Sequence, residues 1–143
     1  MKGMIGVVVV THCHLAEELI CAAELVVGEA LKQFQAVSVG PKDGSDTIRD
    51  KIVAAIRKVE GGQGVLILTD MYGGTPSNIS LSFLEEKKIE VITGVNLPML
   101  LKLATYQSDL SLGELAAFIT DYGQRKINLA SDVLKKRVDR KAG

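Results

Sequence analysis

The sequence predicts an α/β domain built on a small open sheet of about four parallel strands flanked by helices. Apolar, β-branched segments alternate four times with segments of helical periodicity along the 143 residues. The first apolar run, MIGVVVV at 4–10, has no polar side chain, as expected for a strand that is covered on both faces. Turns that are rich in glycine or polar residues follow these runs, where open parallel sheets gather their functional side chains.

The first two strands are each followed by a segment with helical periodicity. After the strand at 4–10, apolar side chains recur every three or four residues over 15–27, and Gly28 is suited to end that helix. Residues 34–39 alternate apolar and polar side chains, which predicts the second strand. The helix expected at 45–59 has a regular apolar face and follows a loop that contains glycine and proline.

The second half of the chain repeats the pattern with shorter elements. A strand is expected at 64–69, and Pro76 suits the first turn of the helix after it, because an N–H at that point would have no partner. The fourth strand is expected at 89–93. Helices follow at 98–106 and 112–124, the second of which begins with a Ser-x-x-Glu capping box.

We expect one domain over 1–125 and a distinct C-terminal segment over 126–143. Residues 127–129 are a candidate antiparallel edge strand, which would cover one of the two exposed edges of a four-stranded sheet. The basic residues that follow predict a solvated, fraying end.

The composition argues against several classes of partner. Lys and Arg equal Asp and Glu at 17 each, so broad electrostatic attraction to nucleic acid or to an anionic membrane is not expected. The opening apolar run is too short to cross a bilayer. The two cysteines, Cys13 and Cys21, lie about two turns apart on the expected first helix, too far for a disulfide, which favours the cytoplasm.

Two side chains are expected to meet at the carboxyl edge of the sheet. His12 follows the first strand and Asp70 follows the third. An imidazole can act as a nucleophile at cellular pH, and a carboxylate on one ring nitrogen would set the tautomer and free the other nitrogen. The alternatives are a histidine that is hydrogen-bonded to backbone at the start of a helix and an aspartate that only caps a loop. The pairing favours the catalytic interpretation.

The loop after Asp70 adds a candidate anion site. Gly73 and Gly74 would let backbone N–H groups approach a phosphoryl group, and Thr75 would add a hydroxyl donor at the start of a helix. The alternative is an ordinary glycine-rich turn. Three further residues could line the site: Thr11 directly before His12, Tyr72 in the same loop as Gly73, and Asn96 after the fourth strand. For Asn96 the alternative is an ordinary turn asparagine ahead of the proline that starts a helix.

No metal or other cofactor is expected. Three consecutive residues, His12, Cys13 and His14, form a poor set of ligands for one ion, and the sequence contains no second ligand cluster. His14 is expected to face solvent in the first turn of the helix.

Three segments in this order resemble the IIA component of the mannose family of the bacterial phosphoenolpyruvate-dependent sugar phosphotransferase system. They are the apolar strand that ends in Thr11-His12 together with LAEEL at 15–19, LTDMYGGTPSN at 68–78, and ITGVNLPML at 92–100. The resemblance covers roughly residues 4–125.

The resemblance implies that His12 accepts a phosphoryl group from the carrier protein HPr and passes it to a separate IIB protein during sugar uptake. Asp70 would orient the ring, and Gly73, Gly74 and Thr75 would border the group. Family members are typically dimers that exchange a C-terminal edge strand, for which 127–129 is the candidate. The chain departs from the family pattern at Cys13 and Val10, where the family usually has glycine.

Three alternatives remain at this stage. A regulatory module would use the same phosphohistidine as a signal, and the phosphotransfer subunit of dihydroxyacetone kinases would send the phosphoryl group to another acceptor. A non-catalytic domain that binds a small ligand would not accept a phosphoryl group at all. Phosphoryl acceptance therefore separates the first two from the third.

Overall fold

The computed structural model describes residues 4–85, 88–106 and 109–142. Its described part forms one parallel sheet with the strand order β2-β1-β3-β4. Each strand pairs in parallel with its neighbours, which confirms the predicted class of fold. The strands are β1 (Gly6–His12), β2 (Phe34–Val39), β3 (Val65–Thr69) and β4 (Ile89–Thr93).

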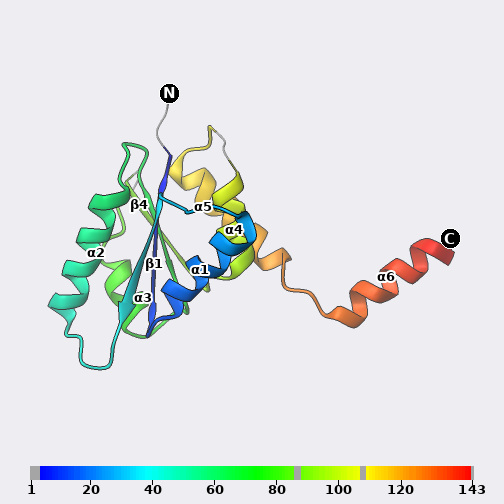
Figure 1. The fold of residues 1–143 in the computed structure, drawn as a ribbon, viewed down its shortest axis with the longest axis horizontal. Coiled ribbons are helices and arrows are strands. Elements are labelled where there is room, and N and C mark those ends of the chain that lie inside the picture. The colour runs from blue at the N-terminus through cyan, green and yellow to red at the C-terminus, as the bar shows by residue number, and fades with distance from the viewer. Residues whose placement is uncertain (1–3, 86–87, 107–108, 143) are drawn as a thin grey trace.

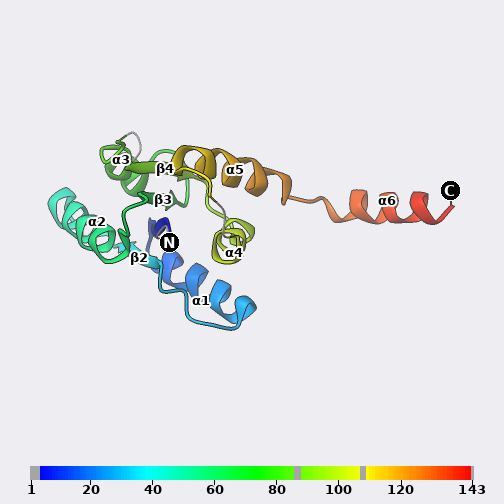
Figure 2. The same ribbon diagram turned by 90° about the horizontal axis from the view of Figure 1, so that it is seen from above.

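The helices form a layer on each face of the sheet (Figure 2). Those that pack on one face are α1 (Leu15–Val27), α4 (Leu97–Thr105) and α5 (Leu112–Arg125). Those on the other face are α2 (Ser45–Val59) and α3 (Thr75–Leu81). A further helix, α6 (Ala130–Ala142), follows α5. Among the described residues, none of these helices combines the length and the apolar character needed to cross a bilayer.

The first apolar run has no polar side chain because β1 lies between two layers of helices. Val7 and Val9 of β1 pack in the core under α1, α4 and α5, whereas Val8 and Val10 pack under α2 and α3. Successive side chains of a strand point to opposite faces, so a strand between two helical layers must be apolar throughout. At Gly6 a Cβ atom would lie 2.5 Å from the carbonyl oxygen of Val59, which requires glycine there.

Strand β1 extends past the predicted end at residue 10. His12 pairs with Val39 of β2, and Cys13 donates its backbone N–H to the carbonyl of Val39 at 2.9 Å. Polar residues therefore continue the ladder after the apolar run has ended. The extension carries His12 on a hydrogen-bonded strand rather than on a free loop.

The C-terminal segment differs from the prediction. Residues 127–129 form no strand in the single chain and lead into α6, which we did not predict from the sequence. Eight of the 13 residues of α6 are Ala, Leu, Lys or Arg, which are strong helix formers. Helix α6 extends away from the body of the domain (Figures 1 and 2). Exchange of an edge strand between subunits stays a prediction.

Candidate functional site

The sheet brings His12 and Asp70 to the same edge. Strands β1 and β3 are neighbours, and their register pairs Val10 with Thr69. His12 at the end of β1 and Asp70 directly after β3 therefore emerge side by side. The parallel order of the strands brings together two residues that are 58 positions apart in the chain.

The His12 ring is held by the Asp70 carboxylate. The distance between His12 Nδ1 and Asp70 Oδ2 is 2.8 Å, and the backbone N–H of His12 donates to the same oxygen at 3.1 Å. The Asp70 side chain is 14% exposed, whereas the His12 side chain is 48% exposed. The carboxylate is thus a largely buried anchor, and the imidazole remains open to a partner in solution.

The electrostatics of the pair define the tautomer of the ring. Partial burial of Asp70 acts to raise its pKa, but hydrogen bonds from the ring and the backbone of His12 outweigh burial and hold the pKa below its ordinary value. The carboxylate is therefore ionised at neutral pH and can only accept hydrogen bonds. In the neutral imidazole Nδ1 must then carry the proton, which leaves a lone pair on Nε2.

The free edge of the ring faces the glycine-rich loop. A Cβ atom at Gly74 would lie 3.3 Å from His12 Cε1 and 3.4 Å from Nε2, so the backbone of Gly74 lies directly beside these atoms. Gly73 and Gly74 have φ angles of +86° and +85°, a region that favours glycine. Helix α3 begins at Thr75, with Pro76 in its first turn as predicted.

Two of the predicted lining residues have structural hydrogen bonds of their own. Thr11 is buried, and its Oγ1 accepts the backbone N–H of Ala16 at 2.7 Å. Asn96 caps α4, because its Oδ1 accepts the N–H of Met99 at 3.1 Å, and its Nδ2 donates to the carbonyl of Gly123 at 3.0 Å. Both residues therefore help to hold helices in place.

Exposed apolar side chains flank the site, and only one of them was singled out from the sequence. Tyr72 is 77% exposed and Met71 is 53% exposed in the loop after Asp70. Leu15, at the start of α1, is 46% exposed. The helical periodicity over 15–27 predicts that Leu15 packs on the sheet, but Leu15 lies directly after the His12 turn and its side chain is exposed. His14 is exposed, as expected, and its Nδ1 lies 3.4 Å from Oε2 of Glu17.

Cys13 forms the turn between His12 and α1. Its φ angle is +52°, the one positive value among the described residues other than glycine. The side chain is exposed and the thiol is free. This backbone conformation explains in physical terms why glycine would suit the position.

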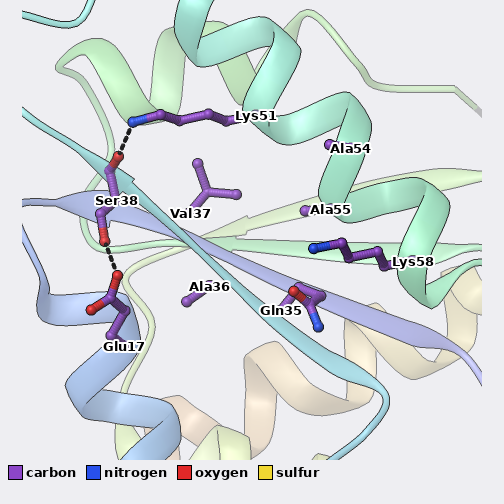
Figure 3. A pocket seen from close by; sticks show the side chains of 9 residues that line it. All are labelled: Glu17, Gln35, Ala36, Val37, Ser38, Lys51, Ala54, Ala55 and Lys58. Carbon is purple, nitrogen blue, oxygen red and sulfur yellow. Dashed lines mark hydrogen bonds between the residues drawn. The ribbon is translucent and has the colours of Figure 1, made fainter.

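A groove of about 310 Å³ lies along the outer edge of β2 and is separate from this site (Figure 3). Ser38 donates its hydroxyl to Glu17 at 3.1 Å, and Lys51 donates to the carbonyl of Ser38 at 3.1 Å (Figure 3). Neither His12 nor Asp70 lines this groove. Within the part of the chain that the structure describes, no three His, Cys, Asp or Glu side chains are grouped as metal ligands.

Comparison with known proteins places the chain among phosphotransferase system components. A family model described as "PTS system fructose IIA component" matches residues 6–120. The chain is 34% identical over 114 residues to the sorbose-specific EIIA component of Lacticaseibacillus casei, covering 79% of this chain and 81% of that protein.

Longer relatives and solved structures agree with this result. The chain is 34% identical over 125 residues to the mannose-specific EIIAB component of Escherichia coli K12, which covers 86% of this chain but only 38% of that protein. The mannose/sorbose-specific IIA subunit from Enterococcus faecalis superposes with a TM-score of 0.78 at 26% identity. That match covers 88% of this chain and 94% of the other.

Proposed function

Because this chain belongs to the mannose-family IIA components of the sugar phosphotransferase system, we propose that it is a phosphocarrier in which His12 holds the phosphoryl group. The donor is phospho-HPr and the acceptor is a IIB protein. The observation that carries the proposal is the 2.8 Å contact between His12 Nδ1 and Asp70 Oδ2, which leaves the Nε2 lone pair available as the nucleophile on a side chain that is 48% exposed.

The transfer itself needs only the two imidazoles and the phosphoryl group. Nε2 of His12 attacks phosphorus while the P–N bond of the donor phosphohistidine breaks, and the donor nitrogen keeps the electron pair. A new P–N bond forms on Nε2, and the positive charge that develops on the ring is stabilised by Asp70. In the second half-reaction the acceptor side chain of IIB attacks the same phosphorus, and His12 returns to its neutral form.

The loop beside the ring is suited to the charge of the transferred group. Phosphoryl transfer depends mainly on positioning and on stabilising charge. Gly73 and Gly74 would offer backbone N–H groups to the phosphoryl oxygens, and Thr75 would offer its hydroxyl. The backbone of Gly74 already lies beside Nε2, so a group bound there would be close to this loop.

The apolar rim around His12 is suited to docking of the partner proteins. Leu15, Met71 and Tyr72 are exposed in the segments that directly follow His12 and Asp70, although all large apolar side chains of β1 and β3 are buried. Exposed apolar side chains beside a reactive group are typical of protein interfaces, in which aromatic residues and Met are enriched. We therefore assign this rim to HPr and IIB in turn.

The proposal extends to the assembly and location of the protein. By its family, the protein would act as a homodimer in the cytoplasm, where two free cysteines are stable. The edge strand exchanged between subunits would come from 127–129. The identity of the sugar would be determined by other components of the system.

Phosphoryl transfer from phosphoenolpyruvate through enzyme I and HPr tests the function directly. The wild type and the variants His12→Ala and His14→Ala would be compared for phosphate that is labile in acid. We expect labelling of the wild type and of His14→Ala, and none of His12→Ala. Labelling that survives in His12→Ala would overturn the assignment of the site. Absence of labelling in the wild type with cognate donors would favour the ligand-binding alternative.

A further inference from the structure

Strand β2 has one edge that faces away from the sheet. In the described part of the sheet β2 pairs only with β1. The carbonyl oxygens of Gln33, just before β2, and of Val39, at its end, accept N–H groups from the β1 side. In a parallel strand the backbone N–H and C=O groups of successive residues point alternately to the two neighbouring strands. The backbone groups of Phe34, Ala36 and Ser38 therefore point to the outer edge.

The two ends of this edge are satisfied, but its middle is open. Phe34 donates its N–H to the carbonyl of Leu31 at 3.2 Å. The carbonyl of Ser38 accepts Nζ of Lys51 at 3.1 Å. Within the described residues, the carbonyl of Phe34, both backbone groups of Ala36 and the N–H of Ser38 have no hydrogen-bond partner. A row of unpaired backbone groups at a sheet edge is a template for a further strand.

Small side chains of α2 leave room beside this edge. Lys51, Ala54, Ala55 and Lys58 line the β2 groove from α2 (Figure 3). Residues three and four apart are neighbours on a helix, so the two alanines lie between the two lysines. Lysine side chains often protect sheet edges, but Lys51 bonds to the Ser38 end and an alanine is too short to cover the middle. The groove therefore gives access to the unpaired backbone groups.

The groove contains a lysine that is free to meet an acidic group. Nζ of Lys51 lies 3.1 Å from Oδ2 of Asp43, whereas Lys58 forms no ion pair with any described residue. Lys58 lies near Gln35, toward the start of β2 (Figure 3). The carboxylate of Glu17 lines the groove from α1. On the α2 side of the open edge the charge is therefore positive.

We infer that the open edge of β2 binds an extended acidic segment of a partner protein, which adds a strand to the sheet. The backbone of that segment would pair with the outward groups of Ala36 and of its neighbours. Its alternate side chains would face α2, where an acidic one would meet Lys58. In binding of this kind the main-chain hydrogen bonds supply affinity, and the side chains on one face supply specificity.

Other occupants from this chain fit the edge less well. Antiparallel pairing of two β2 strands about a two-fold axis would place both α2 helices on the same face, where Lys51 and Lys58 would approach lysines of like charge. Parallel pairing of two copies does not close and would lead to open filaments. Residues 126–143 contain six Lys or Arg and two Asp or Glu, so this segment would also bring like charge to Lys58.

This inference goes beyond the phosphocarrier proposal and does not depend on it. Ser38 pairs with Thr11, one residue before His12, so the groove begins close to the reactive histidine. A partner anchored at β2 would lie near His12 through contacts that do not involve the imidazole. The tests read peptide binding, so they give an answer whether or not His12 accepts a phosphoryl group.

NMR titration with two blocked peptides tests the site. Each peptide has six residues, the length of β2; one alternates valine with glutamate and the other alternates valine with lysine. With the glutamate peptide at about four times its Kd, we expect the amide protons of Ala36 and Ser38 to exchange with water about fivefold more slowly. The amides of Gln35 and Val37, which face β1, are the internal control and should not change. Absence of binding by the glutamate peptide at millimolar concentration, equal binding of both peptides, or equal protection of all four amides would overturn the inference.

Matched variants of α2 test the walls of the groove. Lys58→Gln should weaken binding of the glutamate peptide about fivefold, and Arg57→Gln, at the adjacent exposed position outside the groove, should leave the Kd unchanged. Ala54→Glu should weaken it about tenfold by filling the groove with like charge. Its control is Ala117→Glu, at an exposed position on α5, which should bind normally. Circular dichroism would verify that each variant is folded, and equal effects within either pair would overturn the inference.

Two further measurements identify the occupant and the place. His12→Ala should bind the glutamate peptide as tightly as the wild type, and a loss of binding would move the peptide to the rim of the phosphoryl site. Sedimentation velocity of the wild type and of Ala54→Glu should show the same association state. Association of the wild type that Ala54→Glu abolishes would show that a second copy occupies the edge. Either contrary result would overturn the inference.

Discussion

His12 and Asp70 are joined twice through one oxygen atom. Asp70 Oδ2 accepts both the backbone N–H of His12, at 3.1 Å, and the ring Nδ1, at 2.8 Å. The first bond ties the carboxylate to the end of β1, and the second ties the ring to the carboxylate. The orientation of the imidazole is therefore fixed relative to β1, one of the two central strands of the sheet.

Asp70→Asn keeps the shape of the Asp70 side chain but removes its negative charge, so it tests what the charge contributes. An amide can present its NH₂ group to the ring, which would favour the tautomer with a proton on Nε2, and it cannot stabilise a positive ring. We expect the rate of phosphoryl acceptance to fall by about 100-fold, within the usual range for loss of acid–base or electrostatic assistance. Initial rates of labelling from phospho-HPr would measure it.

A matched control is Asp43→Asn. Asp43 also accepts a backbone N–H, that of Gly40 at 2.7 Å, but it belongs to the loop before α2. We expect Asp43→Asn to leave the rate of phosphoryl acceptance within about twofold of the wild type. A similar fall for both variants would indicate a general effect of lost carboxylates and would contradict the specific role of Asp70.

The sheet and the meeting of His12 with Asp70 could be predicted because they depend on strong local signals. A run of valines must lie between two apolar layers, and parallel strands deliver their carboxyl ends to one edge. The hydrogen bonds of Thr11 and Asn96 could not be predicted, because a Thr or Asn in a turn can face either a ligand or a helix end. Their partners, Ala16 and Gly123, are defined only by the packed structure.

The end of the chain was the least predictable part. Residues 127–129 have the composition of a short strand, but a strand requires a partner edge, which the sequence of one chain does not specify. Helix α6 was missed because its three large apolar residues lie among five basic ones, a pattern we read as a solvated tail. The spacing of Val133, Leu134 and Val138 was the available signal.

Gly74→Ala should impair the site more than the fold. The new Cβ would lie 3.3–3.4 Å from the His12 ring, in the space next to Nε2, and would crowd an incoming phosphoryl group. We expect at least a tenfold loss of acceptance rate, measured by labelling. Gly28→Ala is the control, because Gly28 has a similar φ of +89° at the far end of α1 from His12, and nothing lies within 4 Å of its Cβ. Gly28→Ala should lose about 1–2 kcal/mol of stability. Gly74→Ala should lose about 1–3 kcal/mol, because its φ of +85° and ψ of 169° lie in a region that is essentially restricted to glycine. Equal rates for the two variants would show that contact with the ring is unimportant.

Cys13→Gly should stabilise the protein. A residue with a Cβ in the left-handed region costs about 1–2 kcal/mol, and part of this gain is offset by the greater freedom of glycine in the unfolded chain. We expect the free energy of unfolding in urea to rise by about 0.5–1 kcal/mol. Cys21→Gly, within α1, should lower it by a similar amount because glycine disfavours helices. A loss of stability at both positions would mean that the Cys13 side chain contributes contacts that outweigh the strain.

Acid should weaken the fold in part through Asp70. Its pKa is lowered in the folded state, so the unfolded chain binds a proton more readily, and stability rises with pH across this range. The contribution is complete above the unfolded pKa of about 3.9 and is lost as pH falls through the lower folded value. Urea unfolding at about pH 5 and about pH 3 should therefore show a smaller difference for Asp70→Asn than for the wild type or the exposed Asp50→Asn. If Asp70→Asn showed the same difference in stability between the two pH values as the wild type, groups other than Asp70 would account for the acid sensitivity.

Asn96 is expected to matter for stability and little for transfer. Its side chain caps α4 through Met99 and joins α4 to α5 through the carbonyl of Gly123. Asn96→Ala removes both bonds, and we expect a loss of about 2 kcal/mol in urea unfolding, the sum of a lost cap and a lost part-buried hydrogen bond. Asn96→Asp keeps the cap acceptor but not the donor, so it should lose about half as much.

Labelling of His12 should remain within about twofold in both folded variants, because neither bond touches the ring. A large fall in labelling with full stability would instead place Asn96 in direct contact with the phosphoryl group or a partner.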